Sequence, residues 1–412
     1  MQNLARELNR EQLFSRVNRI TRRGASYPNK DSHDAERCAT LQIMNDHSEH
    51  VNRLMVEASQ LADGPAKVSL IELAVGIADS HQDLDLAFEV RKILLGACLT
   101  ADNSALMLVT FTWCLAQHDR DPERFPLERI LFEFRWVVSS LPTFPEITLT
   151  KIRDMQAEMA RRYESVGASL RSYWLMSRKM AVDMGDINSA SAASEELYRS
   201  PCDWLEDGDE TELGFEITYR LIREEFDLAL KAAWPFVMRE MYSPHFEGQA
   251  CADVLFPLLR ENRAAEAMQF HRRGYRLRSK QIRHLDSIAK HIAFMALTDN
   301  LGRSLRLLER HLPEAMQTSN AFNRLRFLID VLPLFDRLLI SGKETIKIRL
   351  PLEYLKGETE RHSVAELRQW IHDVASKLAA TFDARNGNAY YSERLAGVAQ
   401  MQRWFSACPV GR

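Results

Sequence analysis

One segment of the chain concentrates cationic side chains. Between His271 and Arg283 it carries six arginine or lysine residues and one tyrosine, with no acidic residue among them. Arginine offers a planar, bidentate fork to carboxylate and phosphate groups, so this basic segment could hold a peptide carboxylate or a phosphate. The alternative is a solvated helix end, where cations also interact favourably with the helix dipole. The candidate partner-binding residues are Arg272, Arg273, Tyr275, Arg276, Arg278, Lys280 and Arg283.

A second charged segment is acidic. Six Asp and Glu residues fall between Asp203 and Glu212, close to Pro201, which is typical of a loop. This loop could pair with the basic segment, within one chain or between chains, or bind a cation. Calcium loops need oxygen ligands at fixed spacings and a glycine at a fixed position, and this segment does not follow that pattern. We therefore expect a solvated loop and no metal ion.

A third segment is rich in side chains that form hydrogen bonds. Asp383, Arg385, Asn386 and Asn388 lie together, just before two consecutive tyrosines. They could form a contact loop for a partner. Asn and Gly also favour turns, so the same residues could simply join two helices.

Motifs of known catalytic and cofactor chemistry are missing from the sequence. His47, Glu49 and His50 form a tight cluster, but a zinc-protease helix would need His-Glu-x-x-His. No glycine-rich nucleotide loop and no Gly-x-Ser-x-Gly elbow occurs. We expect no catalytic residue, no metal and no cofactor, although an active site assembled from distant residues stays open.

Composition describes an ordinary globular chain. Its 412 residues are 46% apolar and 27% charged, with a net charge of −3, which does not select nucleic acid or an anionic membrane as partner. Its six cysteines form no Cys-x-x-Cys pair, which favours reduced thiols in a cytoplasm. Arginine greatly outnumbers lysine, a codon bias that suggests a bacterial source. No apolar run approaches the roughly 20 residues of a membrane span.

Helical periodicity dominates the chain. Met1–Arg23 looks amphipathic, as a first or capping helix would, and Glu7 and Glu11 count against a mitochondrial presequence. Apolar residues at spacings of three and four then recur in segments of about 10 to 20 residues separated by short polar turns. These predicted helices are Val68–Ser80, Leu84–Leu99, Ala105–Gln117, Leu127–Ser140, Leu149–Glu164, Ser169–Met184, Gly214–Arg223, Phe226–Trp234, Ala250–Arg260, Ala264–Arg278, Ile282–Leu297, Arg303–His311 and Ala321–Ile340, with Ile187–Tyr198 as an alternative extra helix.

The helices are arranged as pairs at a nearly regular interval. A small residue often follows the turn on the second helix, nine positions after a residue near the end of the first. This spacing holds for Ala78 to Ala87, Tyr163 to Ser172, Leu258 to Ala267 and Met295 to Ser304, whereas Tyr219 to Ala229 is one residue longer. Over residues 65–315 the chain resembles the tetratricopeptide-repeat superfamily. The resemblance implies an all-α, right-handed solenoid of antiparallel helix pairs, and it transfers no functional residue.

The expected organisation has five parts. They are an N-terminal helix and linker (1–64), a first helical-repeat block (65–200), the acidic loop (201–213), a second block (214–342) and a C-terminal helical cap region (343–412). Proline inside a helix removes a backbone hydrogen bond, so we expect kinks or breaks at Pro235, Pro257 and Pro333.

The region after residue 342 differs in pattern from the rest. Thr345–Leu350 alternates like a strand with no partner in the chain, so it could add to the edge of a partner's sheet or be an extended linker. Ser363 and Glu366 form a capping box for a helix to Phe382, and Tyr390–Phe405 is the last predicted helix.

These features favour a non-catalytic scaffold or regulatory adaptor. The first helix of each pair would line a concave groove that binds a peptide or helix of a partner protein. Apolar anchors would supply affinity, and arginine would fix the register on an acidic or C-terminal carboxylate group. The alternatives are an RNA-binding helical-repeat protein and, less favoured, an enzyme with a site between the array and the C-terminal region.

Overall fold

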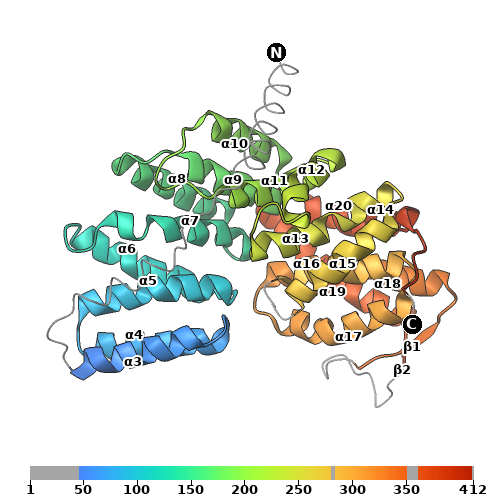
Figure 1. The fold of residues 1–412 in the computed structure, drawn as a ribbon, viewed down its shortest axis with the longest axis horizontal. Helices are drawn as coiled ribbons and strands as arrows, with labels where there is room; N and C mark the ends of the chain where they lie inside the picture. The colour runs from blue at the N-terminus through green and yellow to red at the C-terminus, as the bar shows by residue number, and fades with distance from the viewer. Residues whose placement is uncertain (1–45, 280–283, 350–360, 411–412) are drawn as a thin grey trace. The chain divides into compact units, whose positions relative to one another are not determined.

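The computed structural model describes residues 46–279, 284–349 and 361–410, of which 77% are helical, so the expected all-α class is confirmed (Figure 1). The predicted helix Met1–Arg23 lies outside these residues. None of the described helices is long and apolar enough to cross a bilayer. The first elements are α3 (Asp46–Gln60), α4 (Pro65–Ser80), α5 (Leu84–Thr100), α6 (Ser104–Arg120), α7 (Leu131–Ser140) and α8 (Leu149–Ser165), with the 3-10 turns η2 (Leu127–Arg129) and η3 (Leu141–Thr143).

The remaining elements continue as helices with one small sheet. They are α9 (Arg171–Met184), α10 (Ile187–Arg199), α11 (Asp209–Ile222), α12 (Phe226–Val237), α13 (Pro244–Asp253), α14 (Leu255–Arg260), α15 (Ala264–Arg278), α16 (Leu285–Leu297), α17 (Leu301–Gln317), α18 (Ala321–Ile340), β1 (Thr345–Lys347), β2 (Arg361–Ser363), α19 (Val364–Asn386), α20 (Tyr390–Ala396) and the 3-10 helix η6 (Gly397–Trp404).

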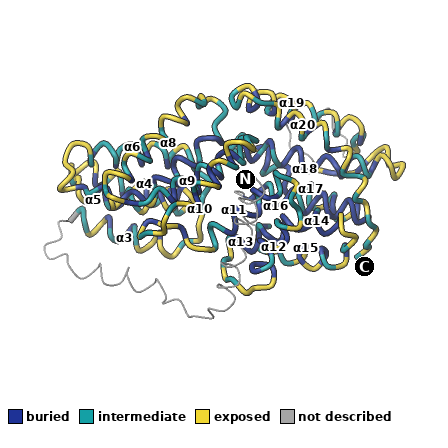
Figure 2. The backbone as a smooth tube through the Cα atoms, turned by 90° about the horizontal axis from the view of Figure 1, so that it is seen from above, coloured by how far each residue is buried: buried dark blue, intermediate teal, exposed yellow. Residues whose placement is uncertain are grey.

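The chain forms two compact units. The first comprises Met1–Val138 and Arg162–Gly167, and the second comprises Ser139–Arg161 and Ala168–Arg412. In the first unit, α3 to α6 pack in sequence order. The buried rings of Phe111 on α6 and Phe134 on α7 lie 4.6 Å apart. In the second unit, the core centres on α16 and α18, and α16 is buried along almost its whole length (Figure 2).

The same three-residue turn joins many consecutive helices. A residue near φ −90° ends the first helix, a residue with positive φ follows, and the next residue begins the second helix. The N–H of that third residue donates to the carbonyl five positions earlier, at 2.8–3.1 Å, which is the long bond of a Schellman motif. The residues with positive φ in these turns are Gln82, Asp102, Gly185, Glu224, Asn262 and Asp299.

The recurring turn explains the spacing of nine in the pairs that it joins, which do not include Tyr163 to Ser172. Nine residues after the accepting carbonyl, a small side chain of the second helix is fully or almost fully buried, which lets the paired helices approach closely. In the turn between α11 and α12 the accepting carbonyl belongs to Arg220, and Ala229 follows it by nine residues. The longer spacing arises only when the count starts one residue earlier, at Tyr219. The small residues are Ala87, Ala190, Ala229, Ala267 and Ser304. After the turn at Asp102, the equivalent residue is the larger Met107.

Helix pairs follow one another through the second unit. The first helices α9, α11, α13, α16 and α18 contact each other in this order, and α10, α12, α15 and α17 each pack on the first helix of their own pair. Each pair alone would leave an apolar side exposed, and packing on the next pair buries it.

Several local expectations need correction. Ala250–Arg260 is two helices, α13 and α14, which meet at Val254. α18 continues through Pro333, and α12 continues for two residues past Pro235, so neither helix breaks at its proline, and the expected kinks there stay predictions. Residues 46–60, expected in a linker, form α3, and the alternative helix Ile187–Tyr198 is present as α10. The last predicted helix is α-helical only to Ala396 and continues as the 3-10 helix η6.

The predicted lone strand has a partner within the chain. Thr345 to Lys347 pair antiparallel with Ser363 to Arg361, so the strand does not need the edge of another protein. The expected cap is confirmed, since the Ser363 side chain accepts from the Glu366 N–H at 3.3 Å and begins α19.

Candidate functional site

As far as Arg278 the basic segment lies on α15, and its side chains point to different sides of the helix. Arg278 is buried and donates to the His245 carbonyl, and half-buried Arg273 pairs with the Glu247 carboxylate at 3.1 Å. Arg272 and Arg276 are exposed. Lys280 and Arg283 lie outside the described residues. The segment therefore divides into arginines that hold α15 in place and arginines that face solvent.

Tyr275 belongs to a hydrogen-bonded relay between α15 and α17. Its hydroxyl lies 2.9 Å from His311 Nε2, and His311 Nδ1 lies 2.6 Å from the Glu314 carboxylate. Burial raises the pKa of Tyr275, so the phenol keeps its proton at neutral pH. The relay joins α15 to α17 through hydrogen bonds.

His271 connects the exposed side of α15 to the core. Its Nδ1 lies 3.2 Å from Nδ1 of buried His291 on α16, so one of the two rings must carry a proton there. Burial, followed by the positive charges of Arg272 and Arg303, lowers the pKa of His271 to about 4. Both arginines line the same pocket as this imidazole.

A pocket of about 220 Å³ lies where α15, α16 and α17 meet. Figure 1 shows these helices next to one another in the second unit. We call this feature the basic pocket. Its polar lining is cationic or neutral, without a carboxylate, and comprises His271, Arg272, Arg303 and Arg306. Its apolar lining comprises Met268, Met295, Leu307 and Val410.

Helical spacing aims these side chains at one place. On α15 they stand at positions 268, 271 and 272, and on α17 at 303, 306 and 307, so both sets follow the i, i+3, i+4 pattern of one helix face. Within the described residues, no carboxylate forms an ion pair with Arg272 or Arg306, and both side chains are exposed. This arrangement can bind an anionic group whose neighbouring atoms are apolar.

The segment after η6 completes the pocket. Its backbone runs along the turn between α16 and α17: the Ser406 and Cys408 N–H groups donate to Leu297 and Thr298 carbonyls at 3.0 and 3.1 Å. The Val410 N–H donates to the Asn300 side chain at 2.9 Å. These bonds bring Val410 to the pocket wall.

The acidic segment is only partly a loop. Residues 201–208 link α10 to α11, but Asp209 begins α11, and the carboxylates in its first turn face the positive end of the helix dipole. Glu212 forms a bidentate pair with Arg171 of α9, with both distances 2.7 Å. The Asp203 carboxylate accepts the Ser169 N–H at 2.5 Å. These contacts pack the segment on the start of α9.

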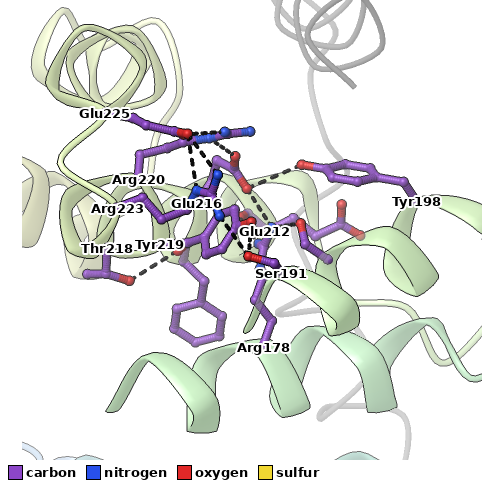
Figure 3. A network of polar contacts seen from close by, with 12 residues as sticks. Arg178, Ser191, Tyr198, Glu212, Glu216, Thr218, Tyr219, Arg220, Arg223 and Glu225 are labelled. Atoms are coloured by element: carbon purple, nitrogen blue, oxygen red, sulfur yellow. Dashed lines mark hydrogen bonds and ion pairs between the residues drawn. The ribbon is translucent and has the colours of Figure 1, made fainter. Parts of the chain in front are cut away.

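A buried polar network joins α9, α10, α11 and α12 (Figure 3). Glu216 lies at its centre, 1% exposed, and contacts Arg178 and Arg220 at 2.5 Å each and the Tyr198 hydroxyl at 3.2 Å. Arg220 and Arg223 both continue to Glu225. Every central charge has a partner and Glu216 is shielded from water, so the network holds helices together.

The predicted contact loop is largely helical, because Asp383, Arg385 and Asn386 lie in the last turn of α19 and only Asn388 follows it. All four side chains form hydrogen bonds within the second unit. Arg385 donates to the Pro142 and Phe144 carbonyls at 2.8 Å each, and Asn386 and Asn388 both donate to the Met184 carbonyl. The Asp383 carboxylate accepts the backbone N–H groups at the start of α20. These bonds cap other elements, and contact with a partner through this loop stays a prediction.

Of the eight residues that line the basic pocket, only Arg272 is a site residue predicted from sequence. Arg303 and Arg306 lie on a helix that the sequence predicts over Arg303–His311 and that extends from Leu301 to Gln317, about 30 residues after the basic segment. Their spacing of three, with Arg310 one turn further on, is the signal that could have indicated a cationic helix face.

Comparison with known proteins identifies no relative. No protein-family model matches the chain, and no curated protein is significantly similar to it in sequence. Among the described residues, no group of three or more His, Cys, Asp or Glu side chains is arranged to hold a metal ion. The function must therefore be inferred from the geometry of the chain itself.

Proposed function

We propose that this protein is a non-catalytic interaction scaffold that binds an acidic segment of a partner protein at the basic pocket. The helix pairs would form a right-handed repeat array of the tetratricopeptide type, in the cytoplasm of a bacterium. The recurring turn, the buried small residues nine positions later and the consecutive contacts of first helices support the array.

One observation carries the binding proposal. Arginines from two different helices converge on one pocket whose remaining lining is largely apolar. Arginine beside apolar side chains, methionine among them, is enriched in protein interfaces. Because α15 and α17 are the second helices of their pairs, the proposed site lies on second helices, whereas the groove expected from sequence would be lined by first helices.

The test is partner capture by charge-reversed variants. Arg272→Glu combined with Arg306→Glu should lose the partner that wild-type protein captures from its native cell, because both guanidiniums then repel an acidic segment. Arg276→Glu is the matched control, since Arg276 is exposed on the same helix but does not line the pocket. A photoreactive amino acid that replaces Leu307 should crosslink to a segment of the partner that is rich in Asp, Glu or another anionic group.

The proposal fails if the double variant captures the same partner as wild type. It also fails if the crosslinked segment carries no anionic group. Circular dichroism of each variant checks that the helical fold is intact.

A further inference from the structure

The segment after η6 crosses the turn between α16 and α17 in the way that an extended peptide binds. We call residues 405–410 the strap. The N–H groups at every second position, in Ser406, Cys408 and Val410, donate to this turn at 2.9–3.1 Å. Between the last two donors stands Pro409, which has no N–H to donate. The donors of the strap therefore all lie on the edge that faces the turn.

Asn300 recognises the backbone of the strap. Its side-chain oxygen accepts the Val410 N–H at 2.9 Å, and its side-chain nitrogen donates to the Cys408 carbonyl at 3.0 Å. Both of these groups belong to the backbone, so the two bonds do not depend on which side chains the bound peptide carries. An extended segment of another protein can therefore form the same two bonds with Asn300.

The strap buries little of its own surface. The side chains of Ser406, Cys408 and Val410 are half-buried, and the three residues that alternate with them are exposed. Segments with few buried apolar contacts open at a lower free energy than the core of a protein. Release of the strap therefore costs less than release of any of the helices that it crosses.

The strap contributes to the basic pocket without neutralising it. Val410 is the strap residue that lines the pocket, and the strap has no charged side chain. Arg272 and Arg306 line the same pocket, and no carboxylate of the described residues forms an ion pair with either of them. A partner segment with an apolar side chain at the position of Val410 and a carboxylate beside these arginines would replace the contacts of the strap and add ion pairs.

We infer that the strap is an autoinhibitory contact, which an acidic, extended segment of the partner displaces from the basic pocket. This inference rests on the proposed function, because it describes how access to the same site is controlled. In the closed state Asn300 holds the strap and Val410 lines the pocket. Binding of the partner releases the strap and transfers the Asn300 bonds to the backbone of the partner.

Cys408 reports release of the strap in the full-length protein. It is half-buried in the strap, whereas Cys202 is exposed and serves as the internal reference. Alkylation with iodoacetamide, followed by mass spectrometry of the tryptic peptides, gives the rate for each thiol. Cys408 should react more slowly than Cys202. Saturating hexaglutamate peptide should accelerate the reaction of Cys408 and leave that of Cys202 unchanged, and hexaserine peptide should change neither.

Proline substitutions in the strap test whether it competes with the ligand. Ser406→Pro removes one donor, so alkylation of Cys408 and affinity for hexaglutamate should each rise about fivefold, the effect of one hydrogen bond on an equilibrium. The ψ angle of Phe405 is 125°, within the range that a residue before proline adopts. Ala407→Pro is the matched control and should behave like wild type, because Ala407 lies between two donors, as Pro409 does.

The results that would overturn the inference are distinct from those that end the proposed function. Unchanged alkylation of Cys408 with hexaglutamate would show that the strap stays in place, and slower alkylation would show that the ligand packs on it. Equal affinity of wild type and Ser406→Pro for hexaglutamate, including binding by neither, would show that the strap does not compete. If partner capture still depends on Arg272 and Arg306 after any of these results, only the strap inference fails. The loss of that dependence would end both.

Discussion

Glu216 is a carboxylate that folding removes from water. Burial by itself raises the pKa of this carboxyl, but the adjacent Arg178 and Arg220 guanidiniums outweigh it, so the pKa in the folded protein lies below its ordinary value. The unfolded chain therefore binds the proton more tightly. The stabilisation from this group is complete above the unfolded pKa, near 4.3, and is lost as pH falls through the lower, folded value.

Glu216→Gln should be one of the costliest polar substitutions in the chain. It leaves Arg178 buried without its counter-charge, and breaking a buried pair costs about 3–5 kcal/mol of unfolding free energy. Urea unfolding at pH 7 measures this loss. Glu196→Gln is the matched control, because the Glu196–Arg199 pair is exposed and such pairs contribute about 0–1 kcal/mol. Equal losses in the two variants would show that Glu216 does not stabilise the fold.

At the scale of elements, the end of α9 is the place where the C-terminal helices dock. Gly185 ends α9 at φ 75°, and a Cβ there would lie 2.2 Å from the Tyr390 ring. The Tyr391 hydroxyl donates to the carbonyl of Asp183, two residues before Gly185. Only glycine meets both demands, because it adopts positive φ at little cost and has no side chain to displace the tyrosine.

Gly185→Ala should destabilise the protein more than Gly387→Ala. Both positions have positive φ, but a Cβ at Gly387 meets no atom within 4 Å. Gly387→Ala should therefore lower the free energy of unfolding only by the cost of a positive φ at alanine, about 1–2 kcal/mol. Gly185→Ala should lower the free energy of unfolding by about 1–3 kcal/mol more, because the new methyl group overpacks against Tyr390. The midpoints of thermal or urea unfolding measure the difference, and a smaller loss at Gly185 would show that α20 does not dock on α9 in this way.

At the scale of the whole molecule, the chain has two compact units. Leu94 of α5 is buried in the first unit, and Leu328 of α18 is buried in the second. In an array of helix pairs, each pair contacts mainly the neighbouring pairs. A cavity therefore weakens the structure near it before it weakens distant parts.

Leu94→Ala and Leu328→Ala should each loosen a different part of the chain. Either change should lower the free energy of unfolding of the surrounding helices by about 2–5 kcal/mol, because apolar burial is lost and a cavity remains. Hydrogen exchange followed by mass spectrometry should show faster exchange in α4 to α6 for Leu94→Ala and in α16 to α18 for Leu328→Ala. Faster exchange throughout the chain in both variants would mean that the units unfold as one.

The sequence by itself determined the helices and their pairing. Ala264–Arg278 and Ala321–Ile340 were predicted with their observed bounds, and the Ser363 cap was found, because apolar periodicity and capping are properties of neighbouring residues. Proline was less informative, since the cost of Pro333 inside a helix is offset by the buried contacts of α18.

Only the tertiary structure decided which charges are available to a ligand. Arg276 and Arg278 are two residues apart, yet one is exposed and the other is buried against the His245 carbonyl. Arg303 and Arg306 belong to the pocket only because α17 packs beside α15 and α16. Side-chain burial depends on which distant helix covers each face, and that choice follows from the packing of many apolar side chains at once rather than from any local pattern.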